Sequence, residues 1–290
     1  MTDISEIKDI YPYKSNYMDL SGVNYHYVDE GEGDPVVMVH GNPTWSFYFR
    51  NLINEFSQTN RVVVPDHIGC GLSEKPQDYK YTLKNHIANL TALVEKLELK
   101  NITLVVHDWG GAIGMGFAVH NPKLIKRIVI LNSGAYSMNH IPFRIAICKI
   151  PWLGEKLVRG LNAFAVPATF MTTKKKLSSQ VKKGFLLPYN NYRNRIAVAR
   201  FVKDIPLGPE HSSYETLLEV EHGLWMFRET PITLIWGMRD WCFNYTFLDK
   251  WTTYYPQAEV HRLDAGHYVI EDATTEVIDY MKQFFKKNPI

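Results

Sequence analysis

The feature that most constrains the fold is an apolar strand pattern that stops abruptly at a polar pair and two glycines. Residues 102–106 are apolar or β-branched, which is typical of a fully buried parallel strand. His107-Asp108-Trp109-Gly110-Gly111 follows, and the small, apolar residues 112–118 then predict a helix packed tightly on the sheet. A strand, a sharp turn and a helix around one reactive side chain form a nucleophile elbow. The apex usually carries serine, but this chain has Asp108 there.

The rest of the chain alternates between strand and helix patterns. Strands are predicted at 15–20, 24–29, 36–39, 61–64, 102–106, 125–131, 231–237 and 258–263, and helices near 46–56, 82–97, 243–254 and 275–287. This alternation predicts an α/β fold with a doubly wound, mostly parallel sheet. Ligands of such sheets bind beyond the carboxyl ends of the strands, where Asn42, Asp108 and Asn132 are expected to lie.

Between residues 132 and 230 the strand rhythm stops, and prolines separate short apolar helical segments. This stretch is too apolar to be a solvated linker. We therefore predict a helical cap domain at 132–230, inserted into a core domain made of 1–131 and 231–290.

Composition excludes several classes of function. The net charge of +2 gives no electrostatic reason to expect nucleic acid or an anionic membrane as a partner. No apolar run approaches the roughly 20 residues that span a bilayer, and residues 1–17 lack the apolar centre of a signal peptide. Cys70, Cys148 and Cys242 are few and far apart, which favours reduced thiols and a cytoplasmic location.

Three chemically active residues follow predicted strands in the order Asp108, Asp240, His267. Nucleophile, acid and histidine in this order form the triad of a large hydrolase fold. A carboxylate is ionised at neutral pH and can attack carbon without a base, forming an ester with the enzyme. His267 would then activate a water, oriented by Asp240.

Such a reaction releases an anion, which needs hydrogen-bond donors. The backbone N–H groups of Asn42 and Trp109 are expected to form an oxyanion-hole pair. The Asn42 amide and the Trp109 indole are also neutral donors that could converge on one small anion. No zinc-type ligand spacing occurs in the sequence, and the predicted reaction requires no metal or cofactor.

At these positions the chain resembles the haloalkane dehalogenase-like branch of the α/β-hydrolases. The resemblance covers essentially the whole chain and implies an eight-stranded, mostly parallel sheet with helices on both faces and an inserted helical cap. It also implies that Asp108 is the nucleophile, that Asn42 and Trp109 bind the leaving group, and that Asp240 and His267 complete the site. Some members carry the acid after the sixth strand, but that region here, Leu131-Asn132-Ser133-Gly134, has no carboxylate, so Asp240 is preferred. The motifs are His40-Gly41-Asn42-Pro43-Thr44-Trp45-Ser46, Val105-Val106-His107-Asp108-Trp109-Gly110-Gly111, Trp236-Gly237-Met238-Arg239-Asp240 and Ala265-Gly266-His267-Tyr268.

Other segments are similar to the β-lactone decarboxylases of bacterial long-chain olefin biosynthesis. This narrower resemblance implies decarboxylation of a long-chain dialkyl β-lactone to an alkene and CO₂, with haloalkane hydrolysis as the alternative. It also implies a hydrophobic small-molecule substrate and association with neighbouring pathway enzymes. The segments are Pro142-Phe143-Arg144-Ile145, residues 159–165, 194–197 and 201–207, Trp241-Cys242-Phe243 and residues 254–261.

Two further functions are compatible with the fold. Epoxide hydrolysis usually needs cap tyrosines, for which Tyr189, Tyr192 and Tyr214 are candidates, but Asn42 suits an anion better. A non-catalytic binding protein would be expected to lack part of the site.

The cap is expected to line an apolar pocket. The lysines at 174–176 and 182–183 form either a solvated face or a docking patch. The pocket candidates are Phe143, Ile147, Trp152, Leu153, Leu161, Phe164, Phe170, Leu186 and Leu187.

Overall fold

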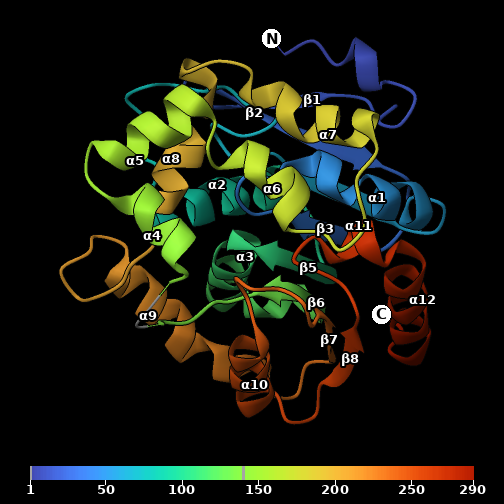
Figure 1. The fold of residues 1–290 in the computed structure, drawn as a ribbon. Coiled ribbons are helices and arrows are strands. Elements are labelled where there is room, and N and C mark those ends of the chain that lie inside the picture. Colours follow the sequence, from blue (N-terminus) through green and yellow to red (C-terminus); the bar gives the residue numbers. More distant parts are fainter. Residues whose placement is uncertain (1, 139–140) are drawn as a thin grey trace.

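Eight strands form one twisted sheet through the centre of the molecule (Figure 1). This computed structural model describes residues 2–138 and 141–290. The strand order is β1-β2-β4-β3-β5-β6-β7-β8; β2 is antiparallel to β1 and β4, and the remaining pairs are parallel. The strands are β1 (Asn16–Leu20), β2 (Val23–Glu30), β3 (Pro35–Val39), β4 (Arg61–Pro65), β5 (Ile102–Asp108), β6 (Ile125–Ser133), β7 (Ile232–Gly237) and β8 (Glu259–Leu263). The predicted α/β fold class is confirmed.

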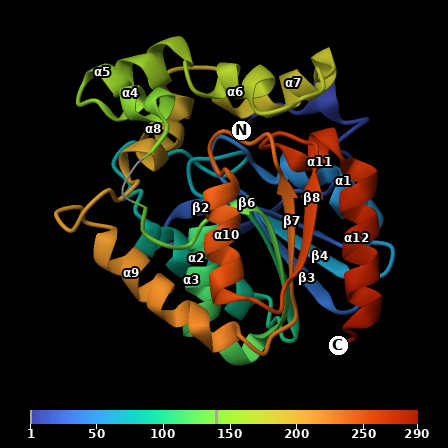
Figure 2. The ribbon, with the colours of Figure 1, turned by 60° about the horizontal axis from the view of Figure 1, so that its bottom comes forward.

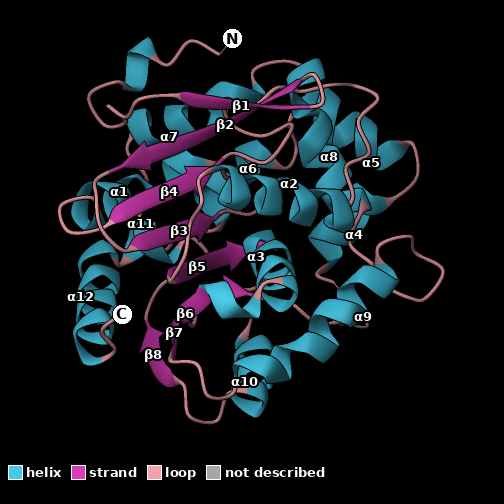
Figure 3. Cartoon of the chain, turned by 180° about the vertical axis from the view of Figure 1, so that it is seen from behind, coloured by secondary structure: helices cyan, strands magenta, loops and turns pink. Residues whose placement is uncertain are grey.

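Helices cover both faces of the sheet because each face is apolar (Figure 3). On one face pack α1 (Arg50–Phe56), α11 (Val269–Asp272) and α12 (Thr274–Lys287). On the other pack α2 (Leu83–Lys96), α3 (Trp109–His120), α9 (Tyr214–Gly223) and α10 (Tyr245–Tyr254). Each residue of β5 is buried, as expected for a strand covered on both sides. Short 3₁₀ segments extend several of these helices, for example η2 (Ser46–Phe49) before α1.

A layer of helices lies over the carboxyl ends of the strands (Figure 2). It comprises α4 (Phe143–Lys149), α5 (Leu153–Glu155), α6 (Ala165–Met171), α7 (Ser179–Leu186) and α8 (Ile196–Lys203), with a π-helical turn at Lys156–Gly160. We call this layer, residues 141–203, the cap.

The division into core and cap domains stays a prediction, and the structure adds two details. Strand β6 runs to Ser133, past the predicted boundary at 131. Helix α9 falls within the predicted 132–230 segment, yet it packs on α3 and α2 in the core (Figure 2). Residues 139–140 of that segment lie outside the described residues. Over the part of the chain that the structure describes, none of the helices has the length and apolar character to cross a membrane.

Candidate active site

Asp108 occupies the apex of a sharp turn between β5 and α3. Its φ of 54° and ψ of −127° are unusual for a residue other than glycine, as expected at a strained elbow. The helix N-terminus begins at the next residue, Trp109, and favours a negative charge there. A side chain at Gly110 would collide with the Val39 carbonyl, and the Ser133 hydroxyl donates a 2.6 Å hydrogen bond to the Asp108 carbonyl. The elbow therefore holds Asp108 at the carboxyl edge of the sheet.

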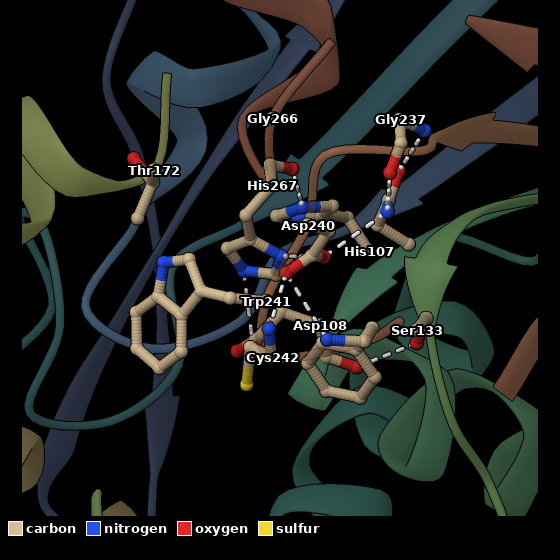
Figure 4. Close-up of polar contacts among 12 residues, drawn as sticks. His107, Asp108, Ser133, Thr172, Gly237, Asp240, Trp241, Cys242, Gly266 and His267 are labelled. Carbon is tan, nitrogen blue, oxygen red and sulfur yellow. Dashed lines mark hydrogen bonds and ion pairs between the residues drawn. The ribbon is translucent and has the colours of Figure 1, made fainter. Parts of the chain in front are cut away.

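Asp108, Asp240 and His267 meet at this edge (Figure 4). His267 Nδ1 lies 2.7 Å from Asp240 Oδ2, and Nε2 lies 3.6 Å from Asp108 Oδ2. All three side chains are buried. Asp240 follows β7 and His267 follows β8, so the parallel strands deliver the three groups to one place.

The charge on His267 follows from its two neighbours. Burial alone would lower its pKa, but the charges of Asp240 and Asp108 and the Asp240 hydrogen bond raise the pKa of His267 to about 10. At neutral pH the imidazole is therefore protonated and donates from Nδ1 to Asp240.

Asp240 is held by donors that the sequence analysis did not assign. The backbone N–H groups of Cys242 and Phe243 donate to Oδ1 at 2.7 and 3.1 Å. The Asn132 amide donates to Oδ2 at 3.0 Å and is itself fixed to both the N–H and the carbonyl of Gly237. Asn132 is thus a positioning residue. The sequence analysis placed Asn132 at the carboxyl end of a strand, beside Asn42 and Asp108, but assigned it no role.

A second positioning residue, His107, lies beside the nucleophile in sequence. Burial and the neighbouring charge of His267 hold the pKa of His107 well below its usual range, so the imidazole is neutral. Its Nε2–H donates to the His267 carbonyl at 2.9 Å, and the two rings lie 4.5 Å apart. His107 therefore fixes the backbone that carries the catalytic imidazole, a role that the sequence pattern gave no reason to expect.

Asn42 contacts Asp108 through its backbone. The Asn42 N–H donates to Asp108 Oδ1 at 2.6 Å and therefore holds the nucleophile. The sequence analysis expected this N–H to bind an oxyanion. One side-chain N–H donates to the Val198 carbonyl of the cap at 3.2 Å. The Asn42 amide and the Trp109 side chain line one cavity with Asp108, which agrees with the predicted grouping.

The loop that carries Asn42 has little freedom. A side chain at Gly41 would come within 1.9 Å of Asp108 Oδ1, so only glycine fits there. The buried His40 donates from Nδ1 to the Gly41 carbonyl at 2.7 Å and accepts the His67 N–H at Nε2, 3.1 Å away. These two hydrogen bonds of His40 fix the position of the loop beside Asp108.

Two apolar cavities open from Asp108, with about 850 and 1020 Å³ of empty space including their mouths. Asn42, Asp108, Ile145, Phe164 and Cys242 line both. We call the first the core arm; its own lining includes Trp109, Ala112, Tyr136, Ile205, Leu217 and Phe247. We call the second the cap arm; its own lining includes Ile147, Leu157, Ala168, Met171, Trp241 and His267.

Only part of the predicted pocket lining is correct. Ile147 and Phe164 line the arms. Phe143, Trp152, Leu161 and Phe170 are instead 60–77% exposed on the outside of the cap, because its short helices turn one apolar side away from the cavity. None of these four, nor Leu153, Leu186 or Leu187, is among the described residues that line either arm.

The tyrosines that could protonate an opening epoxide lie away from the two arms. Tyr189 is fully buried and donates to the Thr44 carbonyl, and Tyr192 is half exposed beneath Arg159. Among the described residues that line the arms, neither these nor Tyr214 appears.

Several lysines of the predicted basic patch already have partners within the chain. Lys174 pairs with Asp264, Lys183 pairs with Glu6, and Lys175 donates to the Asp272 carbonyl. Over residues 2–138 and 141–290, no group of three or more His, Cys, Asp or Glu side chains is arranged to hold a metal ion.

Comparison with known proteins agrees with the fold. The family model described as alpha/beta hydrolase fold matches residues 34–274, and the chain belongs to this family. The solved haloalkane dehalogenase DatA from Agrobacterium tumefaciens superposes with a TM-score of 0.85, covering 94% of this chain and 96% of that one at 24% identity. The chain is therefore an enzyme of the α/β-hydrolase class, and the predicted fold is confirmed.

The relatives divide into two groups. A cis-3-alkyl-4-alkyloxetan-2-one decarboxylase from Shewanella oneidensis is 47% identical over 94% of this chain and 88% of its own length. Haloalkane dehalogenase 2 from Mycobacterium tuberculosis is 31% identical over 95% of this chain and 96% of its own length. The predicted resemblance to both groups is confirmed, and the decarboxylase is the more similar of these two relatives.

Proposed function

We propose that this enzyme decarboxylates cis-3,4-dialkyl β-lactones to cis alkenes, with Asp108 as the nucleophile. One observation carries the proposal: the Asp108 carboxylate, held at Oδ1 by the Asn42 N–H, lies where two apolar arms meet and can attack through Oδ2. A dialkyl lactone has a reactive ring between two apolar chains, which matches this layout. The 47% identity to a decarboxylase of this substrate class supports it.

In the first step Asp108 Oδ2 attacks the ring carbon that bears oxygen, C4. The C4–O bond breaks, and its electron pair leaves on what becomes a carboxylate still attached to C3. The second N–H of the Asn42 amide and the Trp109 indole N–H receive this new anion. The product is an aspartyl ester with inverted configuration at C4.

In the second step the C3–carboxylate bond breaks and CO₂ leaves. That electron pair forms the C3=C4 double bond, and the C4–Oδ2 bond breaks to return the Asp108 carboxylate. Inversion followed by anti elimination converts a cis lactone into a cis alkene. No water or net proton is consumed.

The protonated His267 suits this second step. Its Nε2–H faces Oδ2 at 3.6 Å, where negative charge returns as the ester bond breaks. Water activation, which haloalkane hydrolysis needs, requires the neutral imidazole instead. Formation of the ester removes the Asp108 charge and so lowers the pKa of His267, which keeps haloalkane hydrolysis as the second candidate.

Attack at the lactone carbonyl is the competing route, and it would give an anhydride and then a β-hydroxy acid. That route needs donors for a tetrahedral oxyanion. The Asn42 N–H already binds Asp108 Oδ1, which favours attack at C4.

The deciding experiment gives purified protein a cis-dialkyl β-lactone and 1,2-dibromoethane in parallel. We expect alkene from the lactone, little bromide from the haloalkane, and a loss of turnover by about 10⁴-fold or more in Asp108→Asn with the fold intact. Bromide release without alkene would assign the dehalogenase reaction. A β-hydroxy acid as the sole lactone product would overturn attack at C4, and an alkyl ester trapped on Asp108 in His267→Ala would support it.

We also propose a cytoplasmic location and a hydrophobic small-molecule substrate, with association with enzymes of the same pathway. The three free cysteines support the first, and the apolar lining of both arms supports the second.

A further inference from the structure

The two arms differ in which part of the molecule forms them. The core arm runs between cap residues and the ends of β5 and β6, past α3, α9 and α10. The cap arm runs beneath α4 and α6 and reaches the loops that carry Trp241 and His267. They share the floor at Asp108 and the dividing side chains Ile145 and Phe164.

Both arms are apolar. Their linings are mainly aliphatic and aromatic, and each offers a volume of the same order. A haloalkane with one chain needs one such arm, whereas the second would remain filled with water against apolar walls. Burial of apolar surface stabilises binding by about 25 cal/mol per Å², so an apolar group in each arm is favoured.

We propose that the arms are separate chain sites: one alkyl chain of the lactone enters the core arm and the other enters the cap arm. This proposal rests on the proposed function. In a cis-3,4-dialkyl lactone the chains leave adjacent ring carbons, so two arms that diverge from one nucleophile match their geometry. Chain length at C3 and at C4 is then set by different residues.

Two alanines allow a matched test. Ala112 on α3 lines only the core arm, and Ala168 on α6 lines only the cap arm. Ala112→Leu and Ala168→Leu each add the same three carbon atoms, so each narrows one arm. Ala92→Leu, on α2 and outside the lining of both arms, is the control for the substitution itself.

The substrates are two regioisomeric lactones, one with a long chain at C3 and a methyl at C4, the other reversed. Both give the same cis alkene, so one assay measures both. We expect the two narrowing variants to change the ratio of kcat/KM for the two isomers by about tenfold or more, in opposite directions. Ala92→Leu is expected to leave the ratio unchanged.

Overpacking could unfold a narrowing variant, so its fold is checked by circular dichroism and Tm. Opening variants at half-buried positions, Ile205→Ala in the core arm and Met171→Ala in the cap arm, give a second test. Each should raise kcat/KM for the isomer whose long chain enters its arm, and again the two shifts should be opposite.

The outcomes separate the two proposals. If the wild-type protein releases no alkene from either isomer, the proposed function fails. If it releases alkene but all arm variants change both isomers equally, the function stands and separate chain sites are overturned. Opposite shifts support both.

Discussion

The floor of the active site and the cap above it are built in opposite ways. On the floor, Asp108, Asp240 and His267 are buried, and hydrogen bonds from Asn42, Asn132 and the Asp240 loop fix both carboxylates. The cap presents several large apolar side chains to solvent and supplies shape more than charge. The contrast indicates that the sheet edge sets the chemistry, whereas the cap adds apolar shape to the space above it.

The largest effect that tests this contrast between floor and cap is expected at Gly41. In Gly41→Ala the new methyl group would collide with Asp108 Oδ1 and push the carboxylate away from the Asn42 N–H. We expect kcat to fall by about 10³-fold because the nucleophile is displaced and loses a donor. Steady-state kinetics measures the fall. Activity within tenfold of wild type would mean that the floor is less rigid than its contacts indicate.

The second effect is expected on stability, through the pH dependence of the charge on His267. Its pKa is about 10 in the folded protein against 6.5 for the ordinary group. The folded state therefore holds the proton more tightly, and this contribution to stability is complete below pH 6.5 and lost as the pH rises to about 10. At about 1.4 kcal/mol per pKa unit, its size is about 5 kcal/mol.

Urea unfolding at pH 6, 8 and 10 measures this loss. The control is His267→Gln, whose free energy of unfolding should fall less over the same range. Equal slopes for both proteins would show that His267 is not held between two charges.

Asn132→Asp tests how the floor of the active site holds Asp240. It places a second carboxylate where an amide now donates to Asp240 Oδ2 at 3.0 Å. Repulsion between like charges should displace Asp240, and we expect kcat to fall by about 30-fold with a lowered Tm. Asn132→Leu is the control, since it removes the hydrogen bonds without adding charge. If Asn132→Asp is no worse than Asn132→Leu, repulsion is not the cause.

The floor could be predicted from the sequence because each of its groups directly follows a strand. A parallel sheet brings such positions to one edge, so the order Asp108, Asp240, His267 was enough to group them. The positioning residues were missed because Asn132 and His107 act through hydrogen bonds between distant segments. The use of the Asn42 N–H by Asp108 itself was missed for the same reason.

The cap could be predicted only as helical and apolar. Its helices are short, and some are continued by 3₁₀ or π turns, so no regular spacing indicates which side faces the cavity. Leu161 and Phe164 are three residues apart, yet the first is 74% exposed and the second lines both arms. The two positions can be distinguished only from the packing of the folded protein.

The smallest effect is expected on the outer side of the cap. Phe143 is 77% exposed, so Phe143→Ser should change the free energy of unfolding by less than about 0.5 kcal/mol. The matched core change, Leu104→Ala in the fully buried strand β5, should cost about 3 kcal/mol because it leaves a cavity. Urea unfolding of both variants checks the pair. If Phe143→Ser lowered the free energy of unfolding as much as Leu104→Ala, the outer apolar side chains of the cap would have to be covered in solution. Floor and cap would then differ in their chemistry but not in the burial of their side chains.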